Sequence, residues 1–148
     1  MDNFNGTNYM KNQFCSYEIA KQLKELEFDE ECLCTYTKND KRFMRNPGTN
    51  MLDEPIEDAP YYWQNSKVHE SVICAPLWQQ VIDWFREKQN IYINIEPITF
   101  DDEPTYIFEI INLKNGMLLN NINSSFIDPN EAREQAILKA LELCQKEK

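Results

Sequence analysis

The five cysteines and the single histidine are the side chains best suited to chemistry. Cys32 and Cys34 form a Cys-x-Cys pair, and on a strand both thiols would point to the same face. A zinc site needs two further ligands, for which only Cys15, His69 and Cys74 are available, without a second closely spaced pair. A nucleophilic pair of Cys74 and His69 lacks a third group to orient the base. We therefore interpret the cysteines as small, reduced core residues, and predict no metal, no cofactor and no enzymatic activity.

Two acidic runs are the next candidates, because carboxylates are the ligands that calcium and magnesium prefer. Neither run has the spacing of an EF-hand loop, so we interpret both as solvated loops. With three glycines in the chain, we find no phosphate-binding glycine loop and no nucleophile elbow. The acidic residues are Asp53, Glu54, Glu57 and Asp58 in one run, and Glu96, Asp101, Asp102 and Glu103 in the other.

One basic stretch, "KNDKRFMR", has cationic side chains around an aromatic ring. Such interleaving is typical of surfaces that contact phosphates or nucleic acid. Lysines at the exposed edge of a sheet also prevent that edge from pairing with other chains. We prefer to interpret this stretch as such a solvated strand edge. The side chains in question are Lys38, Lys41, Arg42 and Arg45, around Phe43.

Three consecutive aromatic residues, Tyr61, Tyr62 and Trp63, lie in a long connection over residues 38–72. Long connections inside small domains are often functional. Aromatic side chains there either cover the core or anchor a partner protein. We predict a partner-binding surface formed by these three residues together with Arg42 and Phe43.

The remaining pattern predicts the elements that must position these groups. Ser16 caps a first helix, and Asp128 with Pro129 begins a last one whose apolar stripe is rich in alanine. Strict alternation of isoleucine with polar residues predicts a half-buried strand. In chain order we predict a flexible tail (1–14), a helix within 15–28 capped by Ser16, a strand (31–37), a short strand near 41–45, a helix within 75–90, strands at 91–98 and 105–113, a weaker strand (117–126) and a helix (128–144).

These elements predict an α+β protein with a single domain over residues 15–148. Residues 75–148 supply an α-β-β-β-α sandwich, with two helices on one face of a three-stranded meander. The first helix and strand are expected to extend that sandwich, and residues 38–72 to form an excursion from it.

The second half of the chain resembles the double-stranded-RNA-binding domain, which has the same α-β-β-β-α order. "EAREQAILKALEL" looks like the closing helix of that family, and "DDEPTY" stands where the family has a Gly-Pro-x-His turn. The positions that match the phosphate-binding residues of the family are Pro129, Asn130 and Arg133, and the last of these is basic. The resemblance implies a fold and, as an alternative function, binding of double-stranded RNA or DNA.

Three separated blocks resemble a family of small uncharacterised proteins from bacteriophages and prophages of Bacteroidota. The blocks are "CSYEIAKQLKELEFDEECL", "APLWQQVIDWFREKQNI" and "EAREQAILKALEL". This resemblance implies a phage or mobile-element origin and brings no known activity.

The charge and hydropathy of the chain favour protein over nucleic acid as the partner. A formal net charge of −10 repels phosphate backbones and anionic lipids unless the basic groups are focused in one place. No apolar run has the length needed to span a bilayer. We expect the protein to be located in the cytoplasm of the bacterial host. We predict an accessory protein that acts by protein–protein interaction, on a host factor or on itself. The alternative is nucleic-acid binding through Lys38, Lys41, Arg42, Arg45, Lys114 and Arg133.

Overall fold

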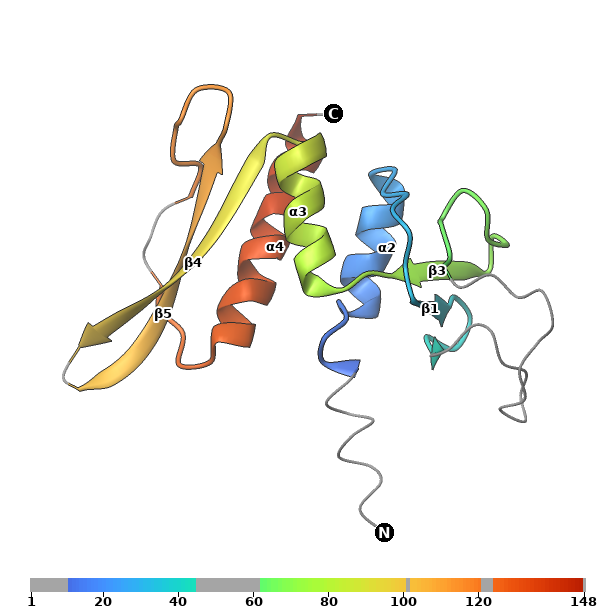
Figure 1. Cartoon of the computed structure of the whole chain (residues 1–148), viewed down its shortest axis with the longest axis horizontal. Coiled ribbons are helices and arrows are strands. Elements are labelled where there is room, and N and C mark those ends of the chain that lie inside the picture. The colour runs from blue at the N-terminus through green and yellow to red at the C-terminus, as the bar shows by residue number, and fades with distance from the viewer. Residues whose placement is uncertain (1–10, 45–61, 101, 121–123, 148) are drawn as a thin grey trace, which may run out of the picture. The chain divides into compact units, whose positions relative to one another are not determined.

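The protein has an α+β fold, as predicted (Figure 1). The computed structural model describes residues 11–44, 62–100, 102–120 and 124–147, which form three helices and two antiparallel sheets. The chain divides into two compact units, Met1–Gln80 (unit 1) and Val81–Lys148 (unit 2), which we describe separately. Among the described residues, none of the helices combines the length and apolar character that crossing a membrane requires. The assignment of residues 15–148 to one domain stays a prediction.

Unit 1 begins with helix α2 (Tyr17–Glu25), whose first turn is capped as the sequence predicts. The backbone N–H of Ile19 donates to the Ser16 hydroxyl (3.4 Å), which satisfies one of the free donors at the helix start. Ile19, Ala20 and Leu23 are fully buried on one face. The apolar face that the spacing predicts is thus the face that meets the core.

A three-stranded antiparallel sheet in the order β2-β1-β3 completes unit 1. Its strands are β1 (Cys34–Thr37), β2 (Phe43–Met44) and β3 (Val72–Ala75). The predicted short strand near residues 41–45 is confirmed, whereas β3 was not predicted. The expected extension of the later sandwich by the first strand is wrong. In the described residues β1 pairs with β2 and β3, in a sheet separate from β4 and β5.

Helix α3 (Trp78–Lys88) spans the division between the units and begins two residues after Pro76. The Leu77 N–H donates to Gln80 Oε1 (2.9 Å), so a side chain satisfies a donor at the helix start. Val81, Trp84 and Phe85 are buried, as the helical spacing predicts.

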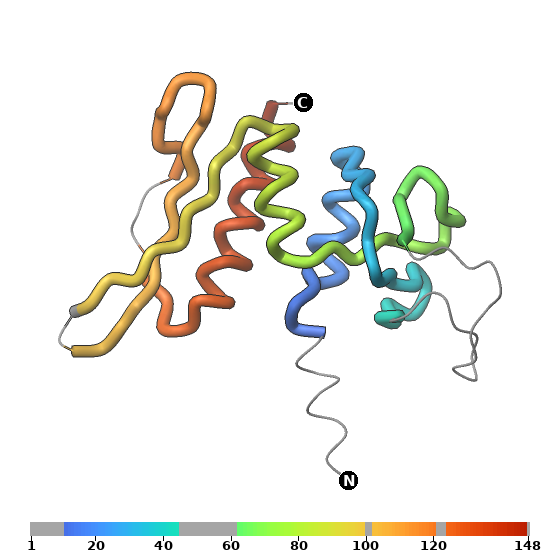
Figure 2. Tube along the Cα trace, in the orientation of Figure 1, coloured from blue at the N-terminus to red at the C-terminus, as the bar shows by residue number. Residues whose placement is uncertain are grey.

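Unit 2 is built on a hairpin of β4 (Ile91–Phe100) and β5 (Glu103–Asn112), whose two arms run side by side in Figure 2. Their residues pair in continuous antiparallel register. Ile93 and Ile110 form a directly opposed pair, and both are buried. The predicted third strand appears, in the described residues, as two isolated bridges to β5. These bridges are Ile111↔Leu118 and Tyr106↔Phe126, and residues 121–123 between them lie outside the description.

Helix α4 (Pro129–Lys146) packs against both strands of the hairpin. Its start is capped as predicted, since Asp128 Oδ1 accepts from the Asn130 N–H (2.9 Å). The small side chains on its buried face allow the helix to approach the sheet closely. The buried residues are Ala132, Ala136, Ile137, Ala140, Leu141 and Cys144.

Candidate protein interface

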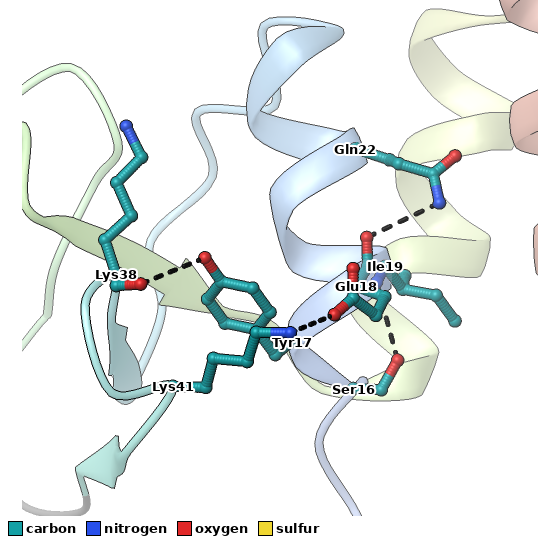
Figure 3. Close-up of polar contacts among 7 residues, drawn as sticks. All are labelled: Ser16, Tyr17, Glu18, Ile19, Gln22, Lys38 and Lys41. Carbon is teal, nitrogen blue, oxygen red and sulfur yellow. Dashed lines mark hydrogen bonds and ion pairs between the residues drawn. The ribbon is translucent and has the colours of Figure 1, made fainter.

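The predicted basic stretch is a tight turn that leads from β1 to β2 and lies against α2 (Figure 3). Lys41 has φ 52°, a left-handed conformation, and its side chain reaches toward Glu18 in the first turn of α2 (Figure 3). Its Nζ lies 2.8 Å from Glu18 Oε1 and 5.0 Å from the centre of the Tyr17 ring. The Tyr17 hydroxyl in turn donates to the Lys38 carbonyl (3.4 Å). The turn is therefore held by one helix through an ion pair, a cation–π contact and a hydrogen bond.

Two cations of the turn, Lys41 and Arg42, each form an ion pair with a nearby carboxylate. The hydrogen bond and charge of Lys41 lower the pKa of Glu18, and the same contact raises the pKa of Lys41. Arg42 Nε lies 4.0 Å from Asp40 Oδ2. A hydrogen bond from the Thr37 hydroxyl, together with Arg42, lowers the pKa of the Asp40 carboxyl. Lys41 and Arg42 each lie beside a carboxylate of this chain, which weakens their attraction for a phosphate.

Phe43 belongs to an aromatic cluster inside unit 1 and is half-buried. Its ring centre lies 5.3 Å from that of Phe14 and 5.4 Å from that of Tyr36. The Tyr36 hydroxyl donates to the Cys15 carbonyl (2.8 Å), and burial raises the pKa of Tyr36. Phe43 thus packs with the core, and the exposure expected of a partner-binding anchor is not found at this position.

Trp63 is likewise half-buried and fixed by its backbone. It exchanges both backbone hydrogen bonds with Cys32, each 2.8 Å long. The Trp63 indole nitrogen is buried and has no hydrogen-bond partner within the described chain. Such an unpaired donor costs about 1–3 kcal/mol.

The residues after Trp63 are tied to the segment that follows α2. Asn65 Nδ2 donates to the Phe28 carbonyl (2.8 Å), and Asn65 Oδ1 accepts from the Cys74 N–H (3.0 Å). The Ser66 hydroxyl donates to Asp29 Oδ2 (2.7 Å). This part of the predicted excursion is therefore integrated into the fold.

Three exposed apolar side chains lie next to these buried aromatic residues. Tyr62 is 52% exposed, Leu33 45% and Met44 37%. Leu33 follows Cys32 and Tyr62 precedes Trp63, so both flank the Cys32–Trp63 bridge on the side opposite to that pair. Met44, the second residue of β2, pairs with Thr35 of β1. We call Leu33, Met44 and Tyr62 the exposed patch.

Sequence reasoning found one of the three patch residues. Tyr62 was predicted, whereas Leu33 and Met44 were not, although each is the neighbour of a predicted core or site residue. Alternation along a strand is the signal that could have found them, because a buried Cys32 and a packed Phe43 imply outward-facing neighbours.

Tyr61 and Arg45 lie outside the described residues, as do the acidic run at 53–58 and Asp101.

All five cysteines are buried free thiols. Burial raises the pKa of Cys15, while a hydrogen bond to Cys74 together with burial raises the pKa of Cys32. The described residues contain no group of three or more histidine, cysteine or acidic side chains arranged to hold a metal ion. His69 Nδ1 lies 2.8 Å from the Ser71 hydroxyl, so its contact is with a neighbouring serine.

The two basic residues predicted in unit 2 differ in exposure. Lys114 is exposed in the turn after β5. Arg133 is half-buried, its Nη2 donates to Asn130 Oδ1 (3.1 Å), and burial lowers its pKa.

A groove of about 270 Å³ lies between β5, the bridged segment and α4 in unit 2. Asn120 forms part of its wall and also completes the β5 edge, accepting from the Ile110 N–H (2.7 Å) and donating to the Phe108 carbonyl (3.1 Å). Lys139 and Glu142 form an ion pair at 3.2 Å. The lining has no histidine or cysteine. The groove is lined by Phe108, Asn120, Ser124, Phe126, Gln135, Leu138, Lys139 and Glu142.

No protein-family model, curated protein or solved structure matches this chain. Inference about its function therefore depends on the geometry described above.

Proposed function

We propose that this chain is a non-enzymatic accessory protein of phage or prophage type that acts in the host cytoplasm by protein–protein interaction. Its contact surface is the exposed patch in unit 1, bordered by Arg42. The partner is a host factor or a second copy of the chain. Phe43 and Trp63, which the sequence also suggested, are half-buried and adjoin Met44 and Tyr62 in sequence.

The exposed patch carries this proposal. Its three apolar side chains stand on backbone fixed by strand pairing and by the hydrogen bonds of Trp63, Asn65 and Ser66. Backbone that hydrogen bonds hold in place has less conformational entropy to lose on binding, and large apolar side chains such as tyrosine supply most of the affinity in compact interfaces. The adjacent Arg42 is exposed and adds a polar rim.

Nucleic-acid binding through a fold like that of the double-stranded-RNA-binding domain is the second proposal. The order α3-β4-β5-α4, with a bridged segment before α4, supports this arrangement for unit 2. The pairing of Lys41 and Arg42 with carboxylates, and the partial burial of Arg133, weaken its electrostatic basis. If it holds, affinity should fall steeply with salt, by about one unit of logarithmic slope per phosphate contact.

A capture experiment with matched variants tests the first proposal. The tagged full chain, a variant with Leu33→Asp and Tyr62→Ala, and a control Ile127→Ala are each exposed to lysate of a Bacteroidota host. Ile127 is 82% exposed and lies in unit 2, so it controls for loss of a surface apolar group. We expect the wild type and the control to retain the same stoichiometric protein, and the double variant to lose it.

Nuclease treatment and moderate salt separate the two proposals. Recovery that survives both treatments supports a protein partner. Recovery that disappears with nuclease supports nucleic-acid binding. Equal capture by the double variant and the wild type, with circular dichroism showing both folded, would remove the exposed patch from the proposal.

A further inference from the structure

Strand β4 is the end strand of its sheet, and the hydrogen bonds of β5 show which of its groups face outward. Tyr106 of β5 exchanges hydrogen bonds of 2.7 and 2.8 Å with Phe126, on the side of β5 away from β4. Its partner across the hairpin is Pro97, which has no N–H to offer. In an antiparallel pair such positions turn their backbone groups away from each other. Pro97 therefore faces the free edge.

The same alternation places three isoleucines at the free edge. Ile91, Ile93 and Ile95 precede Pro97 at intervals of two residues, so their N–H and C=O groups also point outward. Within the described chain no backbone or side-chain hydrogen bond outside the β4–β5 ladder satisfies these groups. Three unpaired positions in register are what an added strand requires, and Pro97 limits its length to about five residues.

The outer face of the hairpin, opposite the buried Ile93 and Ile110, has an apolar cluster at one end. Tyr92 and Ile111 are directly opposed, and Leu118 bridges to Ile111 from the next segment. Tyr92 is 38% exposed, Leu118 48% and Leu113, two residues after Ile111, 46%. An exposed apolar cluster of this kind is typical of a protein-binding surface.

The negative charge of the β4–β5 hairpin indicates which kind of partner would bind at the β4 edge. Residues 91–112 contain no lysine, arginine or histidine and five acidic residues. Glu96 is exposed and Glu109 is half-buried, and both share the outer face with Tyr92, because all three occupy pairs of the same parity. A second copy of this hairpin would bring acid against acid, and a nucleic acid would bring phosphate against acid. A basic segment is attracted to both glutamates.

We propose that the β4 edge binds an extended segment of a partner protein as an added antiparallel strand. Its side chains on the outer face would be basic beside Glu96 and Asn94 and aromatic beside Tyr92. Its alternate side chains would be apolar, beside Ile93 and Ile95. This inference goes beyond the proposed function, because it concerns unit 2 and not the exposed patch.

Fluorescence anisotropy with a labelled, end-blocked peptide tests the proposal on the full chain. The probe has the order lysine–valine–lysine–valine–tyrosine, which matches the edge from Glu96 back to Tyr92. Two control peptides replace both lysines by glutamate, or carry N-methyl groups on both valine amides. We expect saturable binding of the first peptide, and at least tenfold weaker binding of both controls.

Two charge-reversal variants localise the binding. Glu96→Lys should weaken binding of the lysine peptide about tenfold and Glu147→Lys, at the exposed end of α4, should leave it unchanged. No saturable binding of the lysine peptide, equal binding of the N-methylated peptide, or equal loss in both variants would overturn the proposal.

The unit 1 variant keeps this test separate from the proposed function. The chain with Leu33→Asp and Tyr62→Ala should bind the lysine peptide as the wild type does. Failure of the peptide test leaves the exposed patch untouched, and failure of the capture experiment leaves the β4 edge untouched.

Discussion

The two units of this protein are stabilised in different ways. Unit 2 consists of regular elements, a ten-pair hairpin and an 18-residue helix with an alanine-rich buried face. Unit 1 has short strands and a nine-residue helix, with many contacts between side chains and distant backbone. Asn65, Gln64 and Lys24 each bond to a carbonyl at least 35 residues away in sequence.

This difference accounts for where the exposed apolar groups lie. Among the described residues of unit 2, no strand pairs with the outer edge of β4 and α4 packs on one face of the hairpin, so the candidate surface follows the regular alternation of the strands. In unit 1 irregular segments cover most of the apolar side chains, so its candidate surface is a small patch on a rigid frame. In a regular strand or helix, the residue spacing determines which side chains are exposed. In an irregular segment, exposure depends on the individual contacts that each side chain makes.

The largest expected effect is loss of core packing in unit 2. Leu141 is fully buried, so Leu141→Ala should lower the free energy of unfolding by about 2–5 kcal/mol through lost burial and a residual cavity. Ile127→Ala, at a position 82% exposed, should change it by less than about 0.5 kcal/mol. Urea unfolding followed by circular dichroism measures both.

The Leu141→Ala variant also tests whether the two units unfold together. Because the sequence predicts one domain, we expect hydrogen exchange in Leu141→Ala to rise in residues of both units together. Two separate transitions, with unit 1 keeping its protection, would contradict the single-domain prediction and make the units independent folding bodies.

The next largest effect on stability is expected at two asparagines, one in each unit, whose side chains form hydrogen bonds with backbone groups. Asn65 satisfies the Cys74 N–H and the Phe28 carbonyl, and Asn120 satisfies the Ile110 N–H and the Phe108 carbonyl. Alanine at either position removes the side-chain acceptor of a strand N–H, that of Cys74 or that of Ile110.

We expect Asn65→Ala and Asn120→Ala to lower the free energy of unfolding by about 1–3 kcal/mol each in chemical unfolding, since an unpaired buried N–H costs about that much. Asn39→Ala, at an exposed turn position, should cost less than about 0.5 kcal/mol. A negligible cost at Asn120 alone would mean that the regular ladder of unit 2 does not need this contact.

A smaller effect distinguishes two tryptophans of unit 1. Trp78 Nε1 donates to the Asn12 carbonyl (2.8 Å), whereas Trp63 Nε1 is buried without a partner in the described chain. Both changes to phenylalanine remove similar apolar area, so Trp78→Phe should destabilise more than Trp63→Phe, by about 1 kcal/mol. Thermal unfolding of both variants checks this, and a greater loss for Trp63→Phe would show that its indole nitrogen is paired in solution.

The smallest expected effect is electrostatic and depends on pH. Lys41 lowers the pKa of Glu18 below the ordinary value of 4.5, so the stabilisation is present above that value and is lost as pH falls through the lowered pKa. NMR titration should find Glu18 below 4.5 in the wild type and near its ordinary pKa in Lys41→Gln.

Glu142 of unit 2 provides the contrast. Lys146, four residues along the same helix, and Lys139 lower its pKa. Because this pair is local, part of its shift should survive in an isolated α4 peptide, whereas the Glu18 shift requires the tertiary fold. A Glu18 pKa at its ordinary value in the wild type would show that the Lys41 contact does not persist.

The sequence by itself determined the elements with clear periodicity and caps. The α+β class, the Ser16 and Asp128 caps, the two long strands and the buried alanine face of α4 follow from local spacing, which the chain carries within each segment. A weak third strand was predicted over residues 117–126. The described residues of this segment form two isolated bridges to β5, at Leu118 and Phe126.

Only the tertiary structure decided which strands share a sheet and which aromatic side chains are exposed. β1 could have joined β4 and β5, yet it pairs with β2 and with β3, which lies more than 30 residues away in sequence. Phe43 and Trp63 pack inward while Met44 and Tyr62 remain exposed, and the composition of the stretch is the same for either outcome. Strand pairing and burial depend on partners distant in the chain, and no local pattern specifies them.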